Sequence, residues 1–451
     1  MTGRSRAGSA VDRVRQAVAL LRTGKVAEAE SICRAVLGAN PAQPDALHFL
    51  GLIEQHRGNT LAAAQLLRRA TDAAPGYADA WNNLGNLLKL LGDLDGAETA
   101  YQRVIAIQPG HANALSNLGP VLRARGDLAA AEAACREAIR IDPRHVAAHN
   151  NLGNVLHDQG RLDEAAASYR ASIAFDPLHP EGPKLLGLAL AAAGRMDEAQ
   201  QVYRDWLARV PGQPVATHLL AAHSGENVPS RASDGYVKSL FDAMANGFDH
   251  HLSTLEYRAP EIVAAAVARE GPDGAAWSVL DAGCGTGLCA RFLRPGAARL
   301  VGVDLSAGML RRAALLALYD ELIEEELTAH LRARPSAYDL IVSADTLCYF
   351  GALDEVLPAA AAALRPGGRL IFTVERAAGD AGPGGYRLAA HGRYSHAEGY
   401  VREALARAGF AAVAIDEAIL RTERGAPVAG LVATAHLGCA FDTRSDLPPQ
   451  P

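Results

Sequence analysis

Small and apolar residues recur through the first half of the chain with a step of 34 residues. Within each step, apolar residues three and four positions apart mark one face of an α-helix, a glycine turn follows, and a second helical pattern ends at a proline. One such helix pair cannot bury its apolar face alone, so the pattern predicts a stack of pairs, an α solenoid, over residues 10–225. The prolines are Pro41, Pro75, Pro109, Pro143, Pro177 and Pro211, and the turn glycines are Gly24, Gly58, Gly92, Gly126, Gly160 and Gly194.

The third unit illustrates how the pairs should pack. Trp81, Leu84 and Leu88 share one helix face, and Gly85 lies within the same stripe. Glycine on a packed face lets two helix backbones approach closely. A further helix that begins near Pro214 is expected to cap the stack.

The second half of the chain has a different pattern. Residues 226–256 lose the period and predict a linker followed by an amphipathic lid helix, with Tyr236, His250 and His251 as candidate lid residues. Over residues 257–437, short apolar runs alternate with helical patterns, which predicts a Rossmann-like, doubly wound α/β domain. We expect residues 1–9 to be a disordered N-terminus and residues 438–451 to be a flexible tail.

Composition narrows the classes of function. The net charge is −6, from 44 basic and 50 acidic side chains, which disfavours a large nucleic-acid surface. No apolar run approaches the roughly 20 residues that span a bilayer. The six cysteines form no CxxC pair, so we expect reduced thiols, no metal site and a cytoplasmic protein.

A glycine-rich loop carries the clearest chemical signal. The apolar run 277–280 leads into Asp281-Ala-Gly283-Cys-Gly285-Thr-Gly287, and a second apolar run ends at Asp304, 21 positions after Gly283. Such a loop brings backbone N–H groups close to a ligand, and an acid at the tip of the second strand can accept ribose hydroxyls. A dinucleotide site would have a third glycine where this chain has Leu288, and the Asp281 carboxylate would repel a pyrophosphate. A cationic sulfonium nucleoside suits that carboxylate better.

At these residues the chain resembles the class I S-adenosylmethionine-dependent methyltransferases, over roughly residues 257–437. Further motifs are the run Tyr338-Asp-Leu-Ile-Val-Ser-Ala344 and the turn Leu364-Arg-Pro-Gly-Gly368 before an apolar strand. The resemblance implies S-adenosylmethionine as the cofactor. The cofactor-binding residues that it implies are Asp281, Ala282, Gly283, Gly285 and Gly287 for the methionine portion, Asp304 and Leu305 for the ribose, Glu326 near the adenine, and Ala344 at the end of the fourth strand.

The repeats resemble tetratricopeptide repeats (TPR), with units that start near Ala10, Pro44, Ala78, Ala112, Val146 and Pro180. Asn83, Asn117 and Asn151 recur at one repeat position and are candidates for binding the backbone of an extended peptide. The alternative is that asparagine at this position only stabilises packing within the repeats. The solenoid is expected to bind a protein or peptide partner.

The sequence identifies no general base. Transfer from a sulfonium needs mainly orientation of donor and acceptor, so a base is required only when the acceptor must lose a proton. Asp345, Tyr349 and His396 should reach the carboxyl edge of the sheet and are the catalytic candidates, and His391 lies nearby in the sequence. We expect a methyltransferase whose solenoid recruits a protein or peptide. The alternatives are a scaffold with a non-catalytic cofactor-binding domain, and a small-molecule O- or N-methyltransferase that uses its repeats for assembly.

Overall fold

The computed structural model describes residues 9–245, 247–271, 276–379, 381–423 and 425–438. It divides into two compact units, residues 1–194 and residues 195–451. The expected disordered N-terminus and flexible tail fall almost entirely on residues 1–8 and 439–451, which lie outside the described residues.

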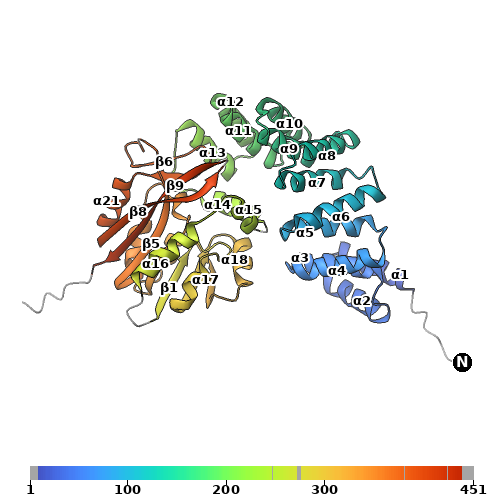
Figure 1. The fold of residues 1–451 in the computed structure, drawn as a ribbon, viewed down its shortest axis with the longest axis horizontal. Helices are drawn as coiled ribbons and strands as arrows, with labels where there is room; N and C mark the ends of the chain where they lie inside the picture. The colour runs from blue at the N-terminus through green and yellow to red at the C-terminus, as the bar shows by residue number, and fades with distance from the viewer. Residues whose placement is uncertain (1–8, 246, 272–275, 380, 424, 439–451) are drawn as a thin grey trace, which may run out of the picture. The chain divides into compact units, whose positions relative to one another are not determined.

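The first unit is a row of helix pairs (Figure 1). In the complete pairs the first helix has 13 residues and the second has 14, so each pair follows the 34-residue step of the sequence. The helices are α1 (Ala10–Arg22), α2 (Val26–Ala39), α3 (Pro44–His56), α4 (Thr60–Ala73), α5 (Ala78–Leu90), α6 (Leu94–Ile107), α7 (Ala112–Ala124), α8 (Leu128–Ile141), α9 (Val146–Asp158), α10 (Leu162–Phe175) and α11 (Glu181–Ala192).

Glycine sets the distance between the two helices of a pair. A Cβ atom on Gly85 of α5 would lie 2.8 Å from the Tyr101 ring of α6, closer than atoms can pack. Tyr101 is fully buried against that glycine. Between the helices, Gly92 adopts φ +80°, a left-handed conformation that favours glycine. The α solenoid predicted from the sequence is confirmed.

The second unit begins with five helices, α12 to α16, and continues into a mixed sheet with helices on both faces. Its helices are α12 (Met196–Arg209), α13 (Pro214–Ser224), α14 (Asp234–Met244), α15 (Phe248–Thr254), α16 (Ala259–Glu270), α17 (Ala290–Leu293), α18 (Ala307–Ala314), α19 (Leu327–Arg332), α20 (Val356–Ala363) and α21 (Glu398–Arg407), with short 3-10 turns at Arg294–Gly296 and Leu347–Tyr349. Its strands are β1 (Trp277–Ala282), β2 (Ala297–Asp304), β3 (Glu321–Glu324), β4 (Tyr338–Ser343), β5 (Leu364–Arg376), β6 (Tyr386–Leu388), β7 (Tyr394–His396), β8 (Phe410–Glu423) and β9 (Ala426–Leu437).

Five strands of the sheet run parallel, in the order β3-β2-β1-β4-β5. β9 pairs antiparallel with β5, and β8 pairs antiparallel with β9. From β1 the chain builds outward first to β2 and β3, and then on the other side to β4 and β5. Open α/β sheets bind ligands outside the carboxyl ends of the strands at such a reversal, so the topology places a crevice at the ends of β1 and β4.

The short strands β6 and β7 form a hairpin beside the carboxyl end of β5. Glu375 of β5 pairs with Ser395 of β7 and also with Gly430 of β9. A strand residue has only two neighbouring strands, so β7 lies on the same edge of β5 as β4. The hairpin therefore extends the sheet beyond the end of β4.

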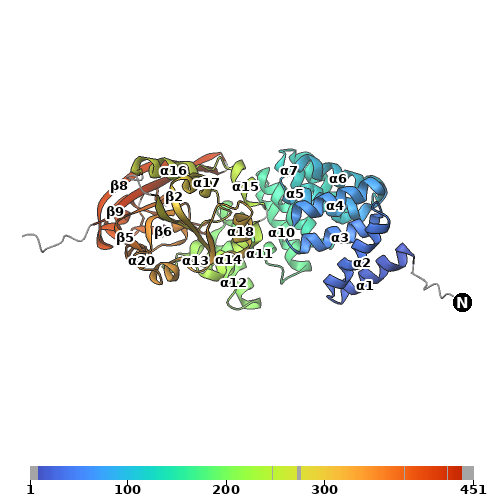
Figure 2. The same ribbon diagram turned by 90° about the horizontal axis from the view of Figure 1, so that it is seen from below.

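Helices cover both faces of the sheet (Figure 2). One apolar cluster joins Val263 of α16 and Leu293 of α17 to the strands. The cluster on the other face includes Leu331 of α19, Leu357 of α20 and Leu405 of α21. The three-layer α/β arrangement expected from the sequence is confirmed.

The segment ahead of the sheet differs from the single lid helix that we expected. It forms two helices, α14 and α15, and Gly247 lies between them. α14 is attached to α13, because the Tyr236 ring stacks on His218 with ring centroids 3.9 Å apart. His218 Nε2 in turn donates to the Gly392 carbonyl at 2.8 Å, so α13 is hydrogen-bonded to the loop between β6 and β7. Among the described residues, no helix is long and apolar enough to cross a membrane.

Candidate active site

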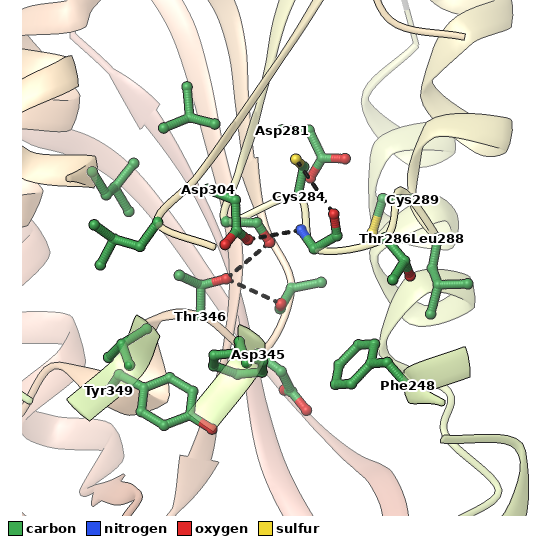
Figure 3. A pocket seen from close by; sticks show the side chains of 18 of the residues that line it. Phe248, Asp281, Cys284, Thr286, Leu288, Cys289, Asp304, Asp345, Thr346 and Tyr349 are labelled. Carbon is green, nitrogen blue, oxygen red and sulfur yellow. Dashed lines mark hydrogen bonds between the residues drawn. The ribbon is translucent and has the colours of Figure 1, made fainter. Parts of the chain in front are cut away.

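A cavity opens at the carboxyl ends of β1, β2 and β4, where the topology predicts one. Its space is about 970 Å³ when the open mouth and the adjoining solvent are included. The lining side chains come from the strand ends, α14, α15 and the loops that follow β3 and β4 (Figure 3). They include Phe241, Phe248, Tyr257, Asp281, Gly283, Cys284, Gly285, Asp304, Leu305, Glu326, Ala344, Asp345, Thr346, Tyr349 and Phe350.

The glycine loop turns sharply after β1. Gly283 has φ +74° and Gly285 has φ +54°, both in the left-handed region that favours glycine. A Cβ atom on Gly283 would overlap Thr346, whereas a Cβ on Gly285 would come no closer than 4.0 Å to Phe248. Gly283 is therefore needed for packing against Thr346 in the segment that follows β4, and Gly285 leaves open space in the cavity.

Asp304 joins the second strand to this loop. Its Oδ2 accepts the Gly285 N–H at 2.9 Å and its Oδ1 accepts the Ser306 N–H at 2.8 Å. A carboxylate can accept about four hydrogen bonds, so it retains capacity toward the cavity. Burial raises the pKa of Asp304, and the two backbone N–H groups oppose that rise.

Asp281 lies at the end of β1 and is 1% exposed. Its Oδ2 accepts a hydrogen bond of 2.7 Å from the Tyr319 hydroxyl. Burial raises the pKa of Asp281 to about 7, although the hydrogen bond favours the ionised form. A buried acid of this kind would be stabilised in its charged state by a cationic ligand.

Glu326 begins α19 and has one oxygen available for a ligand. Its Oε2 accepts the Ala329 N–H at 2.9 Å and caps the helix. Its Oε1 is buried and accepts no hydrogen bond from the described residues. A buried acceptor without a donor is costly, and Glu326 lines the cavity, so a donor on the ligand would satisfy it.

Of the other four residues expected at the cofactor, two line the cavity and two do not. Leu305 and Ala344 line the cavity. Ala282 and Gly287 are not among its lining residues. The Ala282 carbonyl accepts from Ser343 at 3.0 Å, and a Cβ on Gly287 would overlap Leu316. These two residues support the loop rather than face the ligand space.

α14 and α15 form an apolar wall over the glycine loop. Phe241 and Phe248 lie with ring centroids 5.8 Å apart in an edge-to-face arrangement. The ring of Phe241 also packs edge-to-face against the ring of Tyr349, with ring centroids 5.4 Å apart. Asp249 fixes the wall to the loop, because its Oδ1 accepts the Thr286 hydroxyl at 2.5 Å. In Figure 3, Phe248 lies across the view from Asp304.

None of the three candidate lid residues lines the cavity as we expected. His250 and His251 are exposed on α15, and Tyr236 is buried against His218. Phe248, in contrast, turns toward the cavity from the same short helix. The closing surface is thus aromatic and apolar.

Asp345 follows β4 and has φ +52°, which is uncommon for a residue with a side chain. Its Oδ1 accepts the Thr373 hydroxyl at 2.9 Å, and its Oδ2 accepts the Arg421 guanidinium at 2.9 Å. Arg421 also pairs with Glu375 and Glu423, so a buried ionic network holds the acid. Burial raises the pKa of Asp345, and Arg421 opposes the rise.

The other catalytic candidates have different positions. Tyr349 lines the cavity, and so does Tyr257, which the sequence did not single out. His396 does not reach it: the ring is fully buried in β7, and Nε2 donates to the Gly351 carbonyl at 3.1 Å. Burial lowers the pKa of His396 to about 4. His391 is likewise not a lining residue and lies 3.6 Å from Glu375.

Acidic side chains outnumber basic ones among the charged residues of the cavity lining. Five of the described lining residues carry a carboxyl group, and Arg231 is the one cationic side chain among them. Arg231 is paired with Asp234 at 2.6 Å. The cavity therefore favours a cationic or neutral ligand over an anionic one. The lining acids are Asp281, Asp304, Glu325, Glu326 and Asp345.

In the first unit, the three candidate asparagines bind the preceding repeat. Asn83 Nδ2 donates to His48 Nε2 at 2.8 Å, and Asn117 Nδ2 donates to Asn86 Oδ1 at 3.1 Å. Asn151 Nδ2 donates to the Ser116 carbonyl at 2.9 Å. Each carboxamide thus donates at least one N–H inside the solenoid, as the packing alternative predicts, which leaves its oxygen and at most one N–H for a peptide.

Sequence reasoning missed several site residues because they come from distant segments. Tyr319 approaches Asp281 across 38 positions, and Arg421 approaches Asp345 across 76. No local pattern marks such pairs. The break before Phe248 did have a signal, because Asn246-Gly247 is a turn dipeptide.

Comparisons with known proteins agree with the geometry. The family model for a methyltransferase domain matches residues 248–415. Tetratricopeptide repeat models match residues 14–78, 116–183, 76–144 and 156–222. The type IV pilus biogenesis factor PilW, a solved structure, is 19% identical with a TM-score of 0.44, and the match covers 48% of this chain and 100% of PilW.

Several curated relatives are O-methyltransferases by name. The ubiquinone biosynthesis O-methyltransferase of Pectobacterium carotovorum is 33% identical over 99 residues, 21% of this chain and 41% of that protein. The malonyl-[acyl-carrier protein] O-methyltransferase of Geobacter sulfurreducens is 31% identical over 195 residues, 40% of this chain and 71% of that protein. The chain spans 35% to 52% of the length of the first four curated relatives. With the loop, the acids and the topology in place, the chain belongs to the methyltransferase domain family and carries tetratricopeptide repeats ahead of that domain.

Proposed function

We propose that this protein transfers a methyl group from S-adenosylmethionine. The observation that carries the proposal is Asp304, whose carboxylate binds the glycine loop at the reversal of strand order and keeps free acceptor capacity toward the cavity. The acidic lining supports the choice of a sulfonium nucleoside over a dinucleotide, because a pyrophosphate would face the carboxyl groups of Asp281 and Asp304. The cationic side chain among the described lining residues, Arg231, is already paired with Asp234.

The described residues fit each part of this cofactor. Asp304 would accept the ribose hydroxyls, and Asp281 would pair with the methionine ammonium group. The unpaired Glu326 Oε1 would accept the adenine amino group. Gly285, with open space beside it, would let the backbone approach the methionine portion. When bound, the cofactor supplies an activated methyl group on a sulfonium sulfur.

The chain's own part in the reaction is to orient the acceptor and exclude water. The wall of Phe241 and Phe248 closes the cavity, and its aromatic faces suit a neighbouring positive charge. Asp345 and Tyr349 line the same cavity and remain our catalytic candidates. Asp345 would accept a hydrogen bond or a proton from the acceptor, with Arg421 and Thr373 fixing its orientation.

Isothermal titration with S-adenosylmethionine tests the cofactor. We expect binding by the full chain, and an affinity loss of about tenfold or more for Asp304→Ala, since two ribose hydroxyls lose a charged acceptor. Asp354→Ala removes an exposed acid that does not line the cavity and serves as the control. Failure to bind, or equal affinity in Asp304→Ala and the unaltered protein, would exclude the proposal.

The solenoid's role in the proposal is to recruit a protein or peptide that carries or accompanies the acceptor. The repeats themselves support this role, because stacked helix pairs form extended binding surfaces. A cytoplasmic location and the domain limits given above remain expectations from the sequence. A labelled-methyl assay on cell lysate, fractionated by size, would show whether protein becomes labelled.

A small-molecule acceptor is the second candidate, and the apolar wall over the cavity favours it. Phe241, Phe248 and Phe350 offer a surface that an aromatic or aliphatic acceptor would cover. Label in the small-molecule fraction, with none in protein, would select this candidate. Cofactor binding without label in either fraction would leave the scaffold alternative.

A further inference from the structure

The first helices of successive repeats lie side by side in the first unit. α5 contacts α7 and α7 contacts α9, and the hydrogen bonds of Asn117 and Asn151 cross these two junctions. Figure 1 shows α3, α5, α7 and α9 along one side of the array and their partner helices along the other. Residues at the same repeat position therefore form rows across this shared side.

One of these rows is basic. Lys89, Arg123 and His157 are 34 positions apart and lie in the last turns of α5, α7 and α9. Arg123 has a partner from the next repeat, because its Nε lies 2.6 Å from Asp158 Oδ2. The acid that neutralises Arg123 thus comes from the next repeat, where Asp158 directly follows His157 of the row.

The residue that would correspond to Asp158 for Lys89 is apolar. Counting back 34 residues from Asp158 gives Ala124, which is exposed. Lys89 therefore has no acid in the place from which Asp158 serves Arg123. Nor does it pair with a carboxylate elsewhere among the described residues, and burial alone lowers its pKa.

The C-terminal end of α5 explains only part of this arrangement. A cation in the last turn of a helix is favoured by the helix dipole, and Lys89 occupies such a turn. The dipole does not require the Lys89 side chain to be half-buried, which costs its charged group hydration. An exposed lysine in the same turn would gain the dipole without that cost.

We propose that the first unit binds an extended peptide that places an Asp or Glu carboxylate beside Lys89, over Ala124. The ligand's acid would occupy the place that Asp158 occupies beside Arg123. Backbone N–H groups of the peptide would find acceptors in the side-chain carbonyl oxygens of the asparagine row, since each carboxamide is held in place by an N–H that it donates within the solenoid. This inference rests on the recruiting role proposed above and specifies the chemistry of the recruited segment.

The test is selection of a displayed random-peptide library on the immobilised full-length protein. We expect Asp and Glu to be enriched in the retained peptides. For one selected peptide, Lys89→Gln should weaken binding about tenfold. Ala124→Asp should weaken it similarly, because it gives Lys89 a carboxylate from the solenoid itself.

Two control variants separate charge from shape. Ala124→Asn adds a side chain of nearly the same size without charge and should leave binding close to that of the unaltered protein. Lys25→Gln removes a lysine that is already paired with Glu28 and should have no effect. Circular dichroism of each variant confirms that the repeats remain folded.

Each outcome bears on the inference. Retained peptides without acidic residues, or a peptide that binds Lys89→Gln as tightly as the unaltered protein, would overturn it while leaving recruitment intact. If no peptide is retained, both the inference and the recruiting role fail. Titration with S-adenosylmethionine on the same variants should be unchanged, which keeps the cofactor proposal separate.

Discussion

The Tyr319 hydroxyl donates a hydrogen bond of 2.7 Å to Oδ2 of Asp281, inside the sheet's carboxyl edge. The tyrosine favours the ionised acid, yet burial dominates and raises the pKa of Asp281 to about 7. The acid is therefore poised to change its protonation when a charged ligand arrives. The first three predictions below concern Asp281 and the glycine loop that follows it.

Cofactor affinity should depend on pH through Asp281. Only the ionised acid pairs with the methionine ammonium group, so affinity should fall as the pH is lowered from about 7 to about 5.5, with a limiting slope of about tenfold per pH unit. Titration calorimetry at several pH values measures this. Tyr319→Phe removes a hydrogen bond that lowers the pKa and should move the inflection to higher pH, and Asp281→Asn should abolish it. A flat profile in the unaltered protein would contradict the assignment.

The same acid should destabilise the ligand-free protein at high pH. Its pKa is about 7 in the folded state against an ordinary 3.8, so the folded state binds more protons between these values. Stability should consequently fall as the pH rises through this window and remain low above it. Asp281→Asn should raise the unfolding free energy at pH 8 by roughly 1–3 kcal/mol, while losing cofactor affinity. Chemical denaturation at pH 8 and pH 4 tests it, and an equal effect at both pH values would speak against burial of the charge.

Gly285→Ala should damage binding more than stability. Its φ of +54° costs an alanine roughly 1–2 kcal/mol, and the new Cβ would project into the open space of the cavity. Gly225→Ala is the matched control, since Gly225 has φ +70° and open space around it but does not line the cavity. The melting temperature should fall by a comparable amount in both variants, and cofactor affinity should fall only in Gly285→Ala. Loss of binding in both would point to general unfolding.

The hydrogen bond between Asp249 and Thr286 should slow cofactor release. Asp249→Asn weakens the attachment of α15 to the glycine loop, and a loss of about 1 kcal/mol corresponds to about fivefold faster dissociation. Stopped-flow displacement measures the rate. His250→Ala, on the same helix but exposed, should leave it unchanged. Identical rates in Asp249→Asn and the unaltered protein would show that α15 does not restrain the ligand.

His396 should not act as a base. Burial lowers its pKa to about 4, so it stays neutral from about pH 5 to pH 8 and has no contact with the cavity. His396→Gln should reduce stability by roughly 1–3 kcal/mol, through the hydrogen bond to Gly351, without moving the pH profile of methyl transfer. Asp345→Asn is the comparison: if Asp345 accepts a proton, its variant changes the profile. A shifted profile in His396→Gln would restore the histidine as a candidate.

The repeat pattern allowed the solenoid to be predicted nearly to the residue. α5 begins at Ala78 and α9 at Val146, the unit starts expected from the sequence. Prolines and glycines act locally, so their positions determine where helices stop and turns begin. The glycine loop and Asp304 could be placed for the same reason, since both lie at strand ends.

Contacts between distant segments could not be predicted in this way. The network that holds Asp345 depends on Arg421 in β8, and the closing wall depends on how α14 meets Tyr349. The asparagine row shows the same limit. Its spacing was evident, but only the structure shows that Asn83 donates to His48 rather than outward.

The structural division after Gly194 places α12 and α13 in the unit that carries the sheet. Through His218 and Gly392, the last helix of the periodic series is bonded to a hairpin 174 positions later in the chain. The boundary between the two units therefore lies within the periodic region of the sequence and not after its end. Over evolutionary time, whole modules could be added or lost upstream of this boundary, while the enzyme half would keep its own terminal helix pair.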